Sequence, residues 1–167
     1  MIKRIAFMTG GGDSAGINSF IAAAIRCGIE EYGAEFIGIR KAFEGAASDN
    51  IEDQVTHFTL EDALDLQDKP STALASSRFN PFSEANAKAG YPERILQNLR
   101  RLNVDAVLLT GGNDTIKSGL GLHRMGMPVI AAPKSIDNDV SGTDTMLGFK
   151  TAVAFGGTAF RGTAVSA

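Results

Sequence analysis

The sequence lacks several features that mark specialised classes of protein. It contains a single cysteine, Cys27, so an intrachain disulfide is excluded. Because Cys27 lies in an apolar helical pattern, we expect its thiol in or near the core. No run of about 18 apolar residues is present, and the N-terminus lacks the apolar region of a secretory signal. We therefore expect a cytoplasmic protein that is not held in a membrane.

Basic residues are not in excess, and no metal-binding or nucleotide-binding signature is obvious. The 16 Lys and Arg against 19 Asp and Glu give a net charge of -3, which predicts no general attraction to nucleic acid. The histidines have no partners at metal-ligand spacing, and we assign His57 to a loop and His123 to a helix. A Gly-x-x-x-x-Gly-Lys-Ser/Thr loop is absent, and Gly10-Gly-Gly-Asp13 does not fit the dinucleotide fingerprint.

What is present is an alternation of apolar runs and amphipathic segments. With 167 residues and 44% hydrophobic content, the chain can bury one sizeable core. The alternation predicts an α/β fold, a three-layer, doubly wound, mostly parallel sheet with helices on both faces. Residues 42–48 read as a turn-rich excursion, and residues 49–68 as short irregular strands and a helix over the sheet's edge. We expect strands at 2–8, 35–39, 104–109 and 128–132, and helices starting at 17, 92, 117 and 146.

Polar loops follow the strands at residues 8–14, 108–115 and 133–139. Because parallel strands end at the same edge of a sheet, these loops suggest one shared crevice. Glycines let the backbone approach a ligand, and the N–H groups that open a helix attract an anion, most often a phosphate. The alternative is a set of ordinary turns with permissive glycines. Asp13 and Ser14 are plausible caps for the helix that follows the first loop.

Charged residues in the loops allow a functional and a structural interpretation. Asp137 and Asp139 could accept a proton from an attacking hydroxyl, or they could close turns through their side chains. Arg78 could place a planar cation against phosphate oxygens, or it could be a surface arginine in a long loop. Spacing alone does not decide between the two interpretations of the aspartates, and for Arg78 the sequence alone favours a surface arginine.

Four motifs occur in order along the chain: TGGGDSAGIN at 9–18, SSRFNPF at 76–82, GGNDT at 111–115 and PKSIDNDVSGTD at 133–144. Together they resemble the 6-phosphofructokinase family over residues 1–155. The resemblance implies a donor-binding domain at 1–155, with 156–167 as an irregular C-terminal tail. It also implies Mg²⁺-dependent phosphoryl transfer from ATP or pyrophosphate to the 1-hydroxyl of fructose 6-phosphate, a step of glycolysis. By position, Asp137 matches the catalytic base, and Asn113 stands where the family has a metal-binding aspartate. The implied donor contacts are Gly11, Arg78, Phe79, Gly112, Asn113, Asp114, Thr115 and Lys134, and the implied substrate contacts are Ser135, Ile136, Asp137 and Asp139.

Several positions bear on the donor and the metal. Asp114 and Lys134 resemble the pyrophosphate-using members, because a carboxylate would repel the α-phosphate of a nucleotide and a lysine suits a smaller anion. Asn113 is a weaker ligand than aspartate for Mg²⁺. Ser71 and Ala75 replace glycines of the family in the loop that approaches the donor, which we expect to stiffen that loop.

The sequence ends before the segments of the family that hold the sugar phosphate. We therefore expect the chain to be incomplete as an isolated enzyme and to form a homo-oligomer or associate with a second half. The alternative is a catalytically silent paralogue, or a fragment, that binds phosphate donors or pairs with an active subunit. A weaker alternative is the NAD kinase group, which has a Gly-Gly-Asp-Gly loop but lacks the Ile-Asp-Asn-Asp segment.

Overall fold

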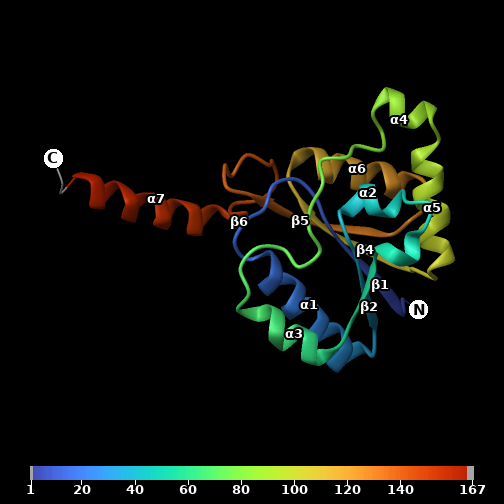
Figure 1. Cartoon of the computed structure of the whole chain (residues 1–167), viewed down its shortest axis with the longest axis horizontal. Helices are drawn as coiled ribbons and strands as arrows, with labels where there is room; N and C mark the ends of the chain where they lie inside the picture. The colour runs from blue at the N-terminus through green and yellow to red at the C-terminus, as the bar shows by residue number, and fades with distance from the viewer. Residues whose placement is uncertain (1, 165–167) are drawn as a thin grey trace.

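A six-stranded sheet lies at the centre of the molecule in the computed structural model, which describes residues 2–164 (Figure 1). The strand order is β3-β2-β1-β4-β5-β6, and β3 alone of these strands runs antiparallel to its neighbour. This sheet confirms the predicted doubly wound α/β class. The strands are β1 (Arg4–Thr9), β2 (Glu35–Ile39), β3 (Val55–Phe58), β4 (Ala106–Gly111), β5 (Val129–Ser135) and β6 (Leu147–Gly148).

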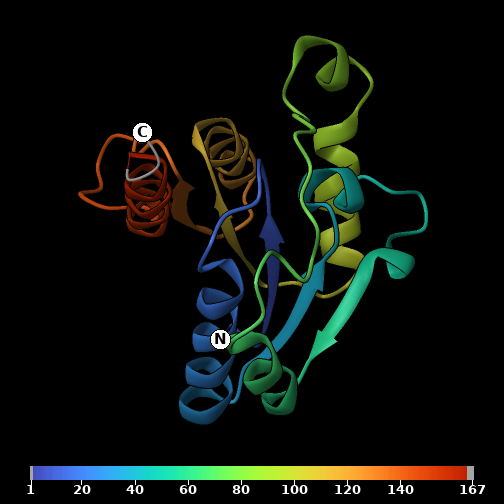
Figure 2. The same ribbon diagram turned by 60° about the vertical axis from the view of Figure 1, so that its left-hand side comes forward.

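Helices cover both faces of the sheet (Figure 2). One face packs against α1 (Ile17–Tyr32) and α3 (Leu60–Gln67), and the other packs against α2 (Ala42–Ala46), α5 (Tyr91–Arg101) and α6 (Asn113–Arg124). The remaining elements are the 3₁₀ turn η1 (Ile51–Gln54), α4 (Glu84–Lys88) and α7 (Phe149–Ala164). In Figure 1, α7 projects away from the body of the molecule.

The three central strands β1, β2 and β4 are largely buried on both faces, as central parallel strands require. Phe7 of β1 points toward α1, where its ring stacks on Phe36 with centroids 5.5 Å apart. Met8, the next residue, points to the opposite side and joins the core beneath α2 and α5. The prediction that Cys27 is buried is wrong, because its side chain is exposed. Cys27 follows the buried Ile25 by two residues, and two residues of an α-helix correspond to a rotation of about 200°, so the two side chains point in nearly opposite directions.

The start of α6 and the cap of α1 differ from expectation, whereas α1 begins at Ile17 as expected. Helix α6 begins at Asn113 rather than 117, so the Asn-Asp-Thr segment forms its first turn. Helix α1 has Gly16 as its N-cap, in the left-handed conformation with φ 88°. Asp13 is therefore not the cap: its carboxylate accepts hydrogen bonds from the Ser14 N–H (2.9 Å) and the Ser71 hydroxyl. Ser14 does not cap this helix either.

Two further expectations need correction. Residues 156–164 are not irregular, because α7 continues through them as one helix without a proline to stop it. Residues 165–167, the rest of that predicted tail, lie outside the described residues. His57 lies in β3, paired with Ile37, rather than in a loop, whereas His123 lies in α6 as expected. Residues 42–46 form the helix α2 instead of turns, and residues 49–68 form η1, β3 and α3, as predicted.

Candidate functional site

The loops after β1, β4 and β5 meet in one cleft at the carboxyl edge of the sheet. The cleft has a volume of about 610 Å³. This arrangement confirms that the three polar loops share a crevice. Its lining comprises Gly11, Ser77, Arg78, Phe79, Asn80, Gly112, Asn113, Asp114, Thr115, Lys117, Ser118, Ser135, Asp137 and Asp139.

The side chain of Thr115 packs against both glycine loops, which are also joined by a hydrogen bond from the Gly10 N–H to the Thr110 carbonyl at 2.9 Å. A Cβ atom at Gly10 would lie 2.5 Å from Thr115 Oγ1, and one at Gly111 would lie 2.5 Å from Thr115 Cβ. A Cβ at Gly12 would meet nothing within 4 Å. Gly10 and Gly111 are therefore required by packing. Thr115, expected to contact the donor, is only 9% exposed, because its side chain packs between the two loops.

The N-terminus of α6 opens at the cleft. Its N-cap, Gly112, offers no side chain to the first-turn N–H groups, so these groups remain available to a ligand. Together with the helix dipole they favour an anion at this position. Asp114 is also in this turn, and its Oδ1 lies 4.0 Å from Nζ of Lys117, one turn along the helix surface.

A network around Ser77 positions the loop that carries Arg78. The Gly11 N–H donates to the Ser77 carbonyl at 3.0 Å, and the Ser77 hydroxyl donates to Glu44 Oε2 at 2.6 Å. That hydroxyl, helped by Lys41, holds the pKa of Glu44 below its ordinary value although desolvation acts in the opposite direction. Arg78 is exposed at the cleft rather than elsewhere on the surface.

Aromatic residues anchor the same loop on its other side. The ring of Phe79 meets that of Tyr91 edge to face, with centroids 5.2 Å apart. The ring of Phe82 lies against Gly121, where a Cβ atom would come within 2.6 Å of it. Phe79 is thus both a lining residue of the cleft and a packing contact for α5.

Lys134 places a buried ammonium group beside the first glycine loop. Its side chain donates a hydrogen bond to the Gly12 carbonyl, and the residue is 4% exposed. Burial lowers the pKa of Lys134, the carboxylate of Asp13 opposes this shift, and the cation of Arg78 adds to it. Gly11, with φ 79°, passes so close that a Cβ there would lie 3.3 Å from Lys134 Nζ.

The opposite wall is formed by the loop after β5. Asn138, with φ 54°, makes the turn contacts: its side chain donates to the Asp144 carbonyl at 3.2 Å and accepts from the Met146 N–H at 3.1 Å. The carboxylates of Asp137 and Asp139 line the cleft. Turn closure is therefore carried by the asparagine, which leaves both neighbouring carboxylates at the cleft.

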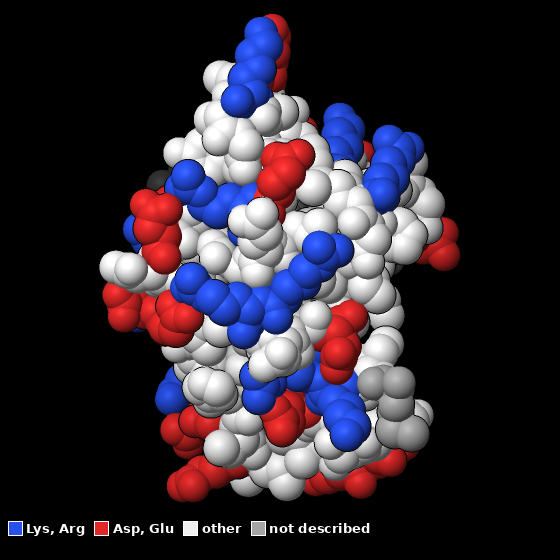
Figure 3. Space-filling view, turned by 90° about the vertical axis from the view of Figure 1, so that its right-hand side faces the viewer, with Lys and Arg blue, Asp and Glu red and all other residues white. Residues whose placement is uncertain are grey.

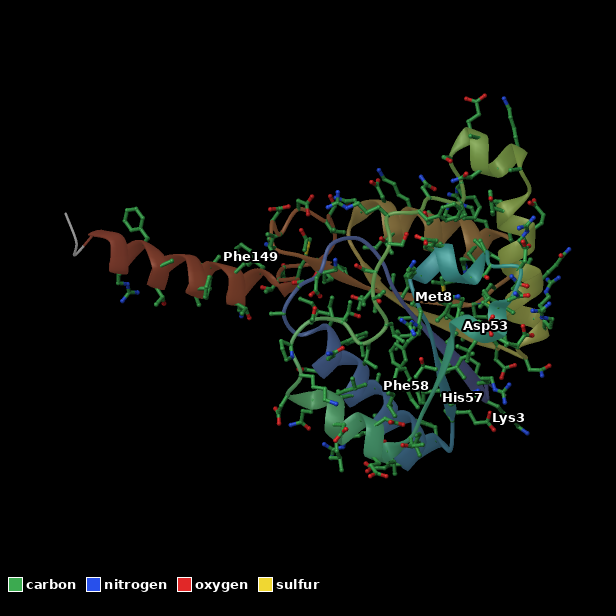
Figure 4. All side chains as sticks on the ribbon, viewed as in Figure 1. Lys3, Met8, Asp53, His57, Phe58 and Phe149 are labelled. Carbon is green, nitrogen blue, oxygen red and sulfur yellow. The ribbon has the colours of Figure 1, made fainter. Side chains whose placement is uncertain are left out.

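Most of the sequence-predicted residues come together here. Lys134 and Ile136 instead line an adjoining hollow of about 270 Å³, which shares Gly11, Arg78 and Asp137 with the cleft. Figure 4 shows Met8 at the end of β1 that leads into this region, and Phe149 at the start of α7 beyond it. Sequence reasoning missed Ser77, Asn80, Lys117 and Ser118 as lining residues, although Ser77 and Asn80 lie within a quoted motif.

The residues of the cleft do not fit a magnesium site built from protein carboxylates. Within residues 2–164, no group of three or more His, Cys, Asp or Glu side chains could hold a metal ion. The amide nitrogen of Asn113 points at Asp139 Oδ2, 3.2 Å away, so this side chain presents a donor where a cation needs an acceptor.

Comparison with known proteins places this geometry in a family. A sequence model described as phosphofructokinase matches residues 4–166, past residue 155, where the resemblance in the sequence was expected to end. ATP-dependent 6-phosphofructokinase 3 of Bacteroides thetaiotaomicron is 37% identical over 153 residues, which is 90% of this chain and 44% of the relative. Pyrophosphate–fructose 6-phosphate 1-phosphotransferase of Streptomyces coelicolor is 36% identical over 151 residues, which is 90% of this chain and 42% of the relative.

Solved structures show the same fold. Phosphofructokinase of Pichia pastoris in the T-state superposes with a TM-score of 0.79 over 89% of this chain and 18% of that chain, at 24% identity. Pyrophosphate-dependent phosphofructokinase of Nitrosospira multiformis gives a TM-score of 0.73 over 88% of this chain and 37% of that chain, at 23% identity.

These comparisons identify the family but not the donor. The chain spans less than half the length of the two curated relatives, and relatives named for ATP and for pyrophosphate match it almost equally well. No helix within the described residues is long and apolar enough to cross a membrane. With a family match that covers nearly the whole sequence and a sheet that superposes on solved members, the chain belongs to the phosphofructokinase family.

Proposed function

We propose that this chain is the donor-binding part of a cytoplasmic phosphofructokinase that transfers a phosphoryl group to the 1-hydroxyl of fructose 6-phosphate. The observation that carries the proposal is the composition of the cleft. Glycine loops, the α6 N-terminus and Arg78 line one side of it, and Asp137 and Asp139 line the other. In-line phosphoryl transfer needs such a pairing of anion-binding groups with a carboxylate that positions the nucleophile.

Each residue then has a chemical role. Asp137 accepts the proton of the attacking hydroxyl. Arg78 and Lys134 bind the donor's phosphate oxygens, together with the backbone N–H groups that open α6 after Gly112, and Gly11 lets the backbone come close to the donor. Ser135, Ile136 and Asp139 contact the sugar side of the cleft. The family implies Mg²⁺, which would neutralise donor oxygens when bound, but the residues present fit it poorly. A homo-oligomer or a second half is the proposed partner.

We propose pyrophosphate as the preferred donor. The carboxylate of Asp114 is exposed in the first turn of α6, where it would face the α-phosphate of a nucleotide. The ammonium of Lys134 lies in the small hollow beside the cleft, within reach of a compact anion. Repulsion of the larger donor and attraction of the smaller one act in the same direction.

Titration calorimetry with pyrophosphate and with ATP tests this assignment. We expect pyrophosphate to bind more tightly to the wild-type chain, and either Asp114→Gly or Lys134→Gly to weaken it without improving ATP binding. The double variant should bind ATP more tightly than the wild type does. Asp53→Gly, an exposed aspartate in η1, is the matched control. Tighter binding of ATP than of pyrophosphate to the wild-type chain would show that the donor assignment is wrong.

A second candidate is a catalytically silent family member that binds phosphate donors or pairs with an active subunit. The hydrogen bond from Asn113 to Asp139 favours it, because an amide occupies the position of the family's metal-binding carboxylate. A transfer assay with labelled pyrophosphate and fructose 6-phosphate distinguishes the two functions. Measurable transfer by the chain, alone or completed by a second half, supports the enzyme, whereas tight pyrophosphate binding without transfer in both cases supports the silent member.

A further inference from the structure

One hydrogen-bonded bridge joins the two walls of the cleft. The side-chain nitrogen of Asn113 donates to Asp139 Oδ2 at 3.2 Å and lies 3.5 Å from the Asp139 carbonyl. This bridge connects the first turn of α6 with the loop after β5. An ionised carboxylate can only accept hydrogen bonds, so the amide must present its nitrogen, not its oxygen, to Asp139.

The electrostatics of this contact depend on the residue at position 113. An aspartate there would place a second carboxylate about where the Asn113 amide now faces Asp139. Two such carboxylates repel each other unless a cation or a shared proton lies between them. The Asn113 amide supplies an N–H in that place, so the walls are joined without an ion.

The cleft and the adjoining hollow hold three cationic side chains, those of Arg78, Lys117 and Lys134, beside the carboxylates of Asp13, Asp114, Asp137 and Asp139. Arg78 lines both the cleft and the adjoining hollow, and its cation is close enough to lower the pKa of Lys134. Lys117 lies at the cleft on α6, beside Asp114. The loop that carries Asp139 is fixed by the hydrogen bonds of Asn138 to Asp144 and Met146, which also need no ion.

We propose that Asn113 takes the place of a divalent cation, and that the cleft binds pyrophosphate as the metal-free anion. The second part of this inference rests on the proposed function. Arg78 and Lys134 supply the charge that Mg²⁺ would otherwise supply, and the amide bridge keeps Asp139 aligned with the α6 N-terminus. Neutralisation of the anion by fixed cations needs no metal ligands.

The first experiment measures Mn²⁺ binding by electron paramagnetic resonance on protein without any phosphate. We expect Asn113→Asp to bind Mn²⁺ at least about tenfold more tightly than the wild type, since a charged oxygen replaces an amide. Asn103→Asp, at an exposed position after α5, makes the same charge change outside the cleft and should behave like the wild type. Wild-type protein that binds Mn²⁺ as tightly as Asn113→Asp would overturn the role given to Asn113.

The second experiment compares pyrophosphate binding in excess chelator and in Mg²⁺, by calorimetry on the wild-type chain. Binding in chelator that is at least as tight as in Mg²⁺ supports metal-free recognition, and binding that requires Mg²⁺ contradicts it. This comparison also decides the matter if Asn113→Asp fails to fold. Asn113→Ala, which removes the bridge without adding charge, should weaken pyrophosphate binding in both conditions. No binding in either condition would remove the proposed function, and the Mn²⁺ comparison would still decide the role of Asn113.

Discussion

Lys134 shows how a single residue can favour binding at the expense of stability. Its ammonium is buried, and burial lowers its pKa below the ordinary value. The unfolded chain therefore holds this proton more tightly than the folded chain does. The stability contributed by Lys134 thus rises as pH increases from the folded pKa toward the unfolded one, and is lowest below that window.

Replacing this lysine by a residue of similar shape tests the conflict. We expect Lys134→Met to raise the free energy of unfolding by about 1 kcal/mol, because it removes a buried charge, and to abolish pyrophosphate binding. Urea unfolding and calorimetry measure the two effects. Lys117→Met, at an exposed lysine of the same cleft, should change stability by less than about 0.5 kcal/mol. A destabilised Lys134→Met would indicate that the Gly12 contact outweighs the burial of the charge.

The lowered pKa of Lys134 also predicts that pyrophosphate binding depends on pH. A bound anion favours the charged form of Lys134, so pyrophosphate affinity should fall as pH rises through the folded pKa of this side chain. Because that pKa is lowered, the fall should begin below the pH at which an exposed lysine loses its proton. Calorimetry over an alkaline pH series measures the effect. An Arg at position 134, Lys134→Arg, should show a flat profile over the same range.

Backbone strain at the loop before Arg78 gives another residue-scale prediction. Ser71 and Ala75 have φ of 72° and 53°, in the left-handed region where a side chain costs about 1–2 kcal/mol. The resemblance in the sequence implies glycine at both positions in the family. Ala75→Gly should therefore raise the free energy of unfolding by about 1 kcal/mol. Ala73→Gly, a nearby alanine outside that region, should lower it, and equal effects of the two changes in urea unfolding would refute the strain argument.

At the scale of elements, the contact between the β1 loop and α6 depends on Thr115. Gly10→Ala should destabilise the fold by about 1–3 kcal/mol, because the new methyl group overlaps the Thr115 side chain. The double variant with Thr115→Ala should recover part of that loss. Gly12→Ala, where the added methyl meets nothing within 4 Å, is the control. If the losses of stability caused by Gly10→Ala and Thr115→Ala simply add in the double variant, as measured by thermal unfolding, the two elements do not interact through this pair.

For the whole molecule, the two sheet edges differ. Helices α1 and α3 cover the β3 side of one face, but Ile130 of β5, on that same face beside Leu108, is 69% exposed. Nearby in sequence, α7 extends from the body with Val153 58% and Phe155 77% exposed (Figure 1). Apolar surface that is exposed in this way favours association.

We predict that the 167-residue chain self-associates through this region. Ile130→Lys and Val153→Glu should each reduce the association measured by light scattering, because they place charge on the exposed apolar surface. Leu64→Lys, at an exposed leucine of α3, is the control. A wild-type chain that stays monomeric as its concentration is raised would contradict the prediction.

The face that carries α5 has a different character. Figure 3 shows Lys and Arg interleaved with Asp and Glu over this face. Arg94 pairs with Asp49 at 2.9 Å, and Arg101 pairs with Glu52 at 2.7 Å. Such exposed pairs contribute about 0–1 kcal/mol each, so they add little to stability.

The sequence by itself determined the class of fold and the position of the cleft. Apolar runs such as residues 35–39 define strands through local composition, and the glycines at 10–12 and 111–112 end strands at one edge of the sheet. Because parallel strands share that edge, loops far apart in sequence had to meet there. The family resemblance came from the same loops.

Tertiary structure alone decided how the side chains of those loops pair. Four of these contacts leave no periodic signal in the sequence. They are the packing of Thr115 between the loops, the burial of Lys134, the hydrogen bond of Ser77 to Glu44 and the hydrogen bond of Asn113 to Asp139. Their partners lie up to 122 residues apart along the chain. Local patterns record which face of an element is apolar, whereas these contacts arise from where separate elements come to rest against one another.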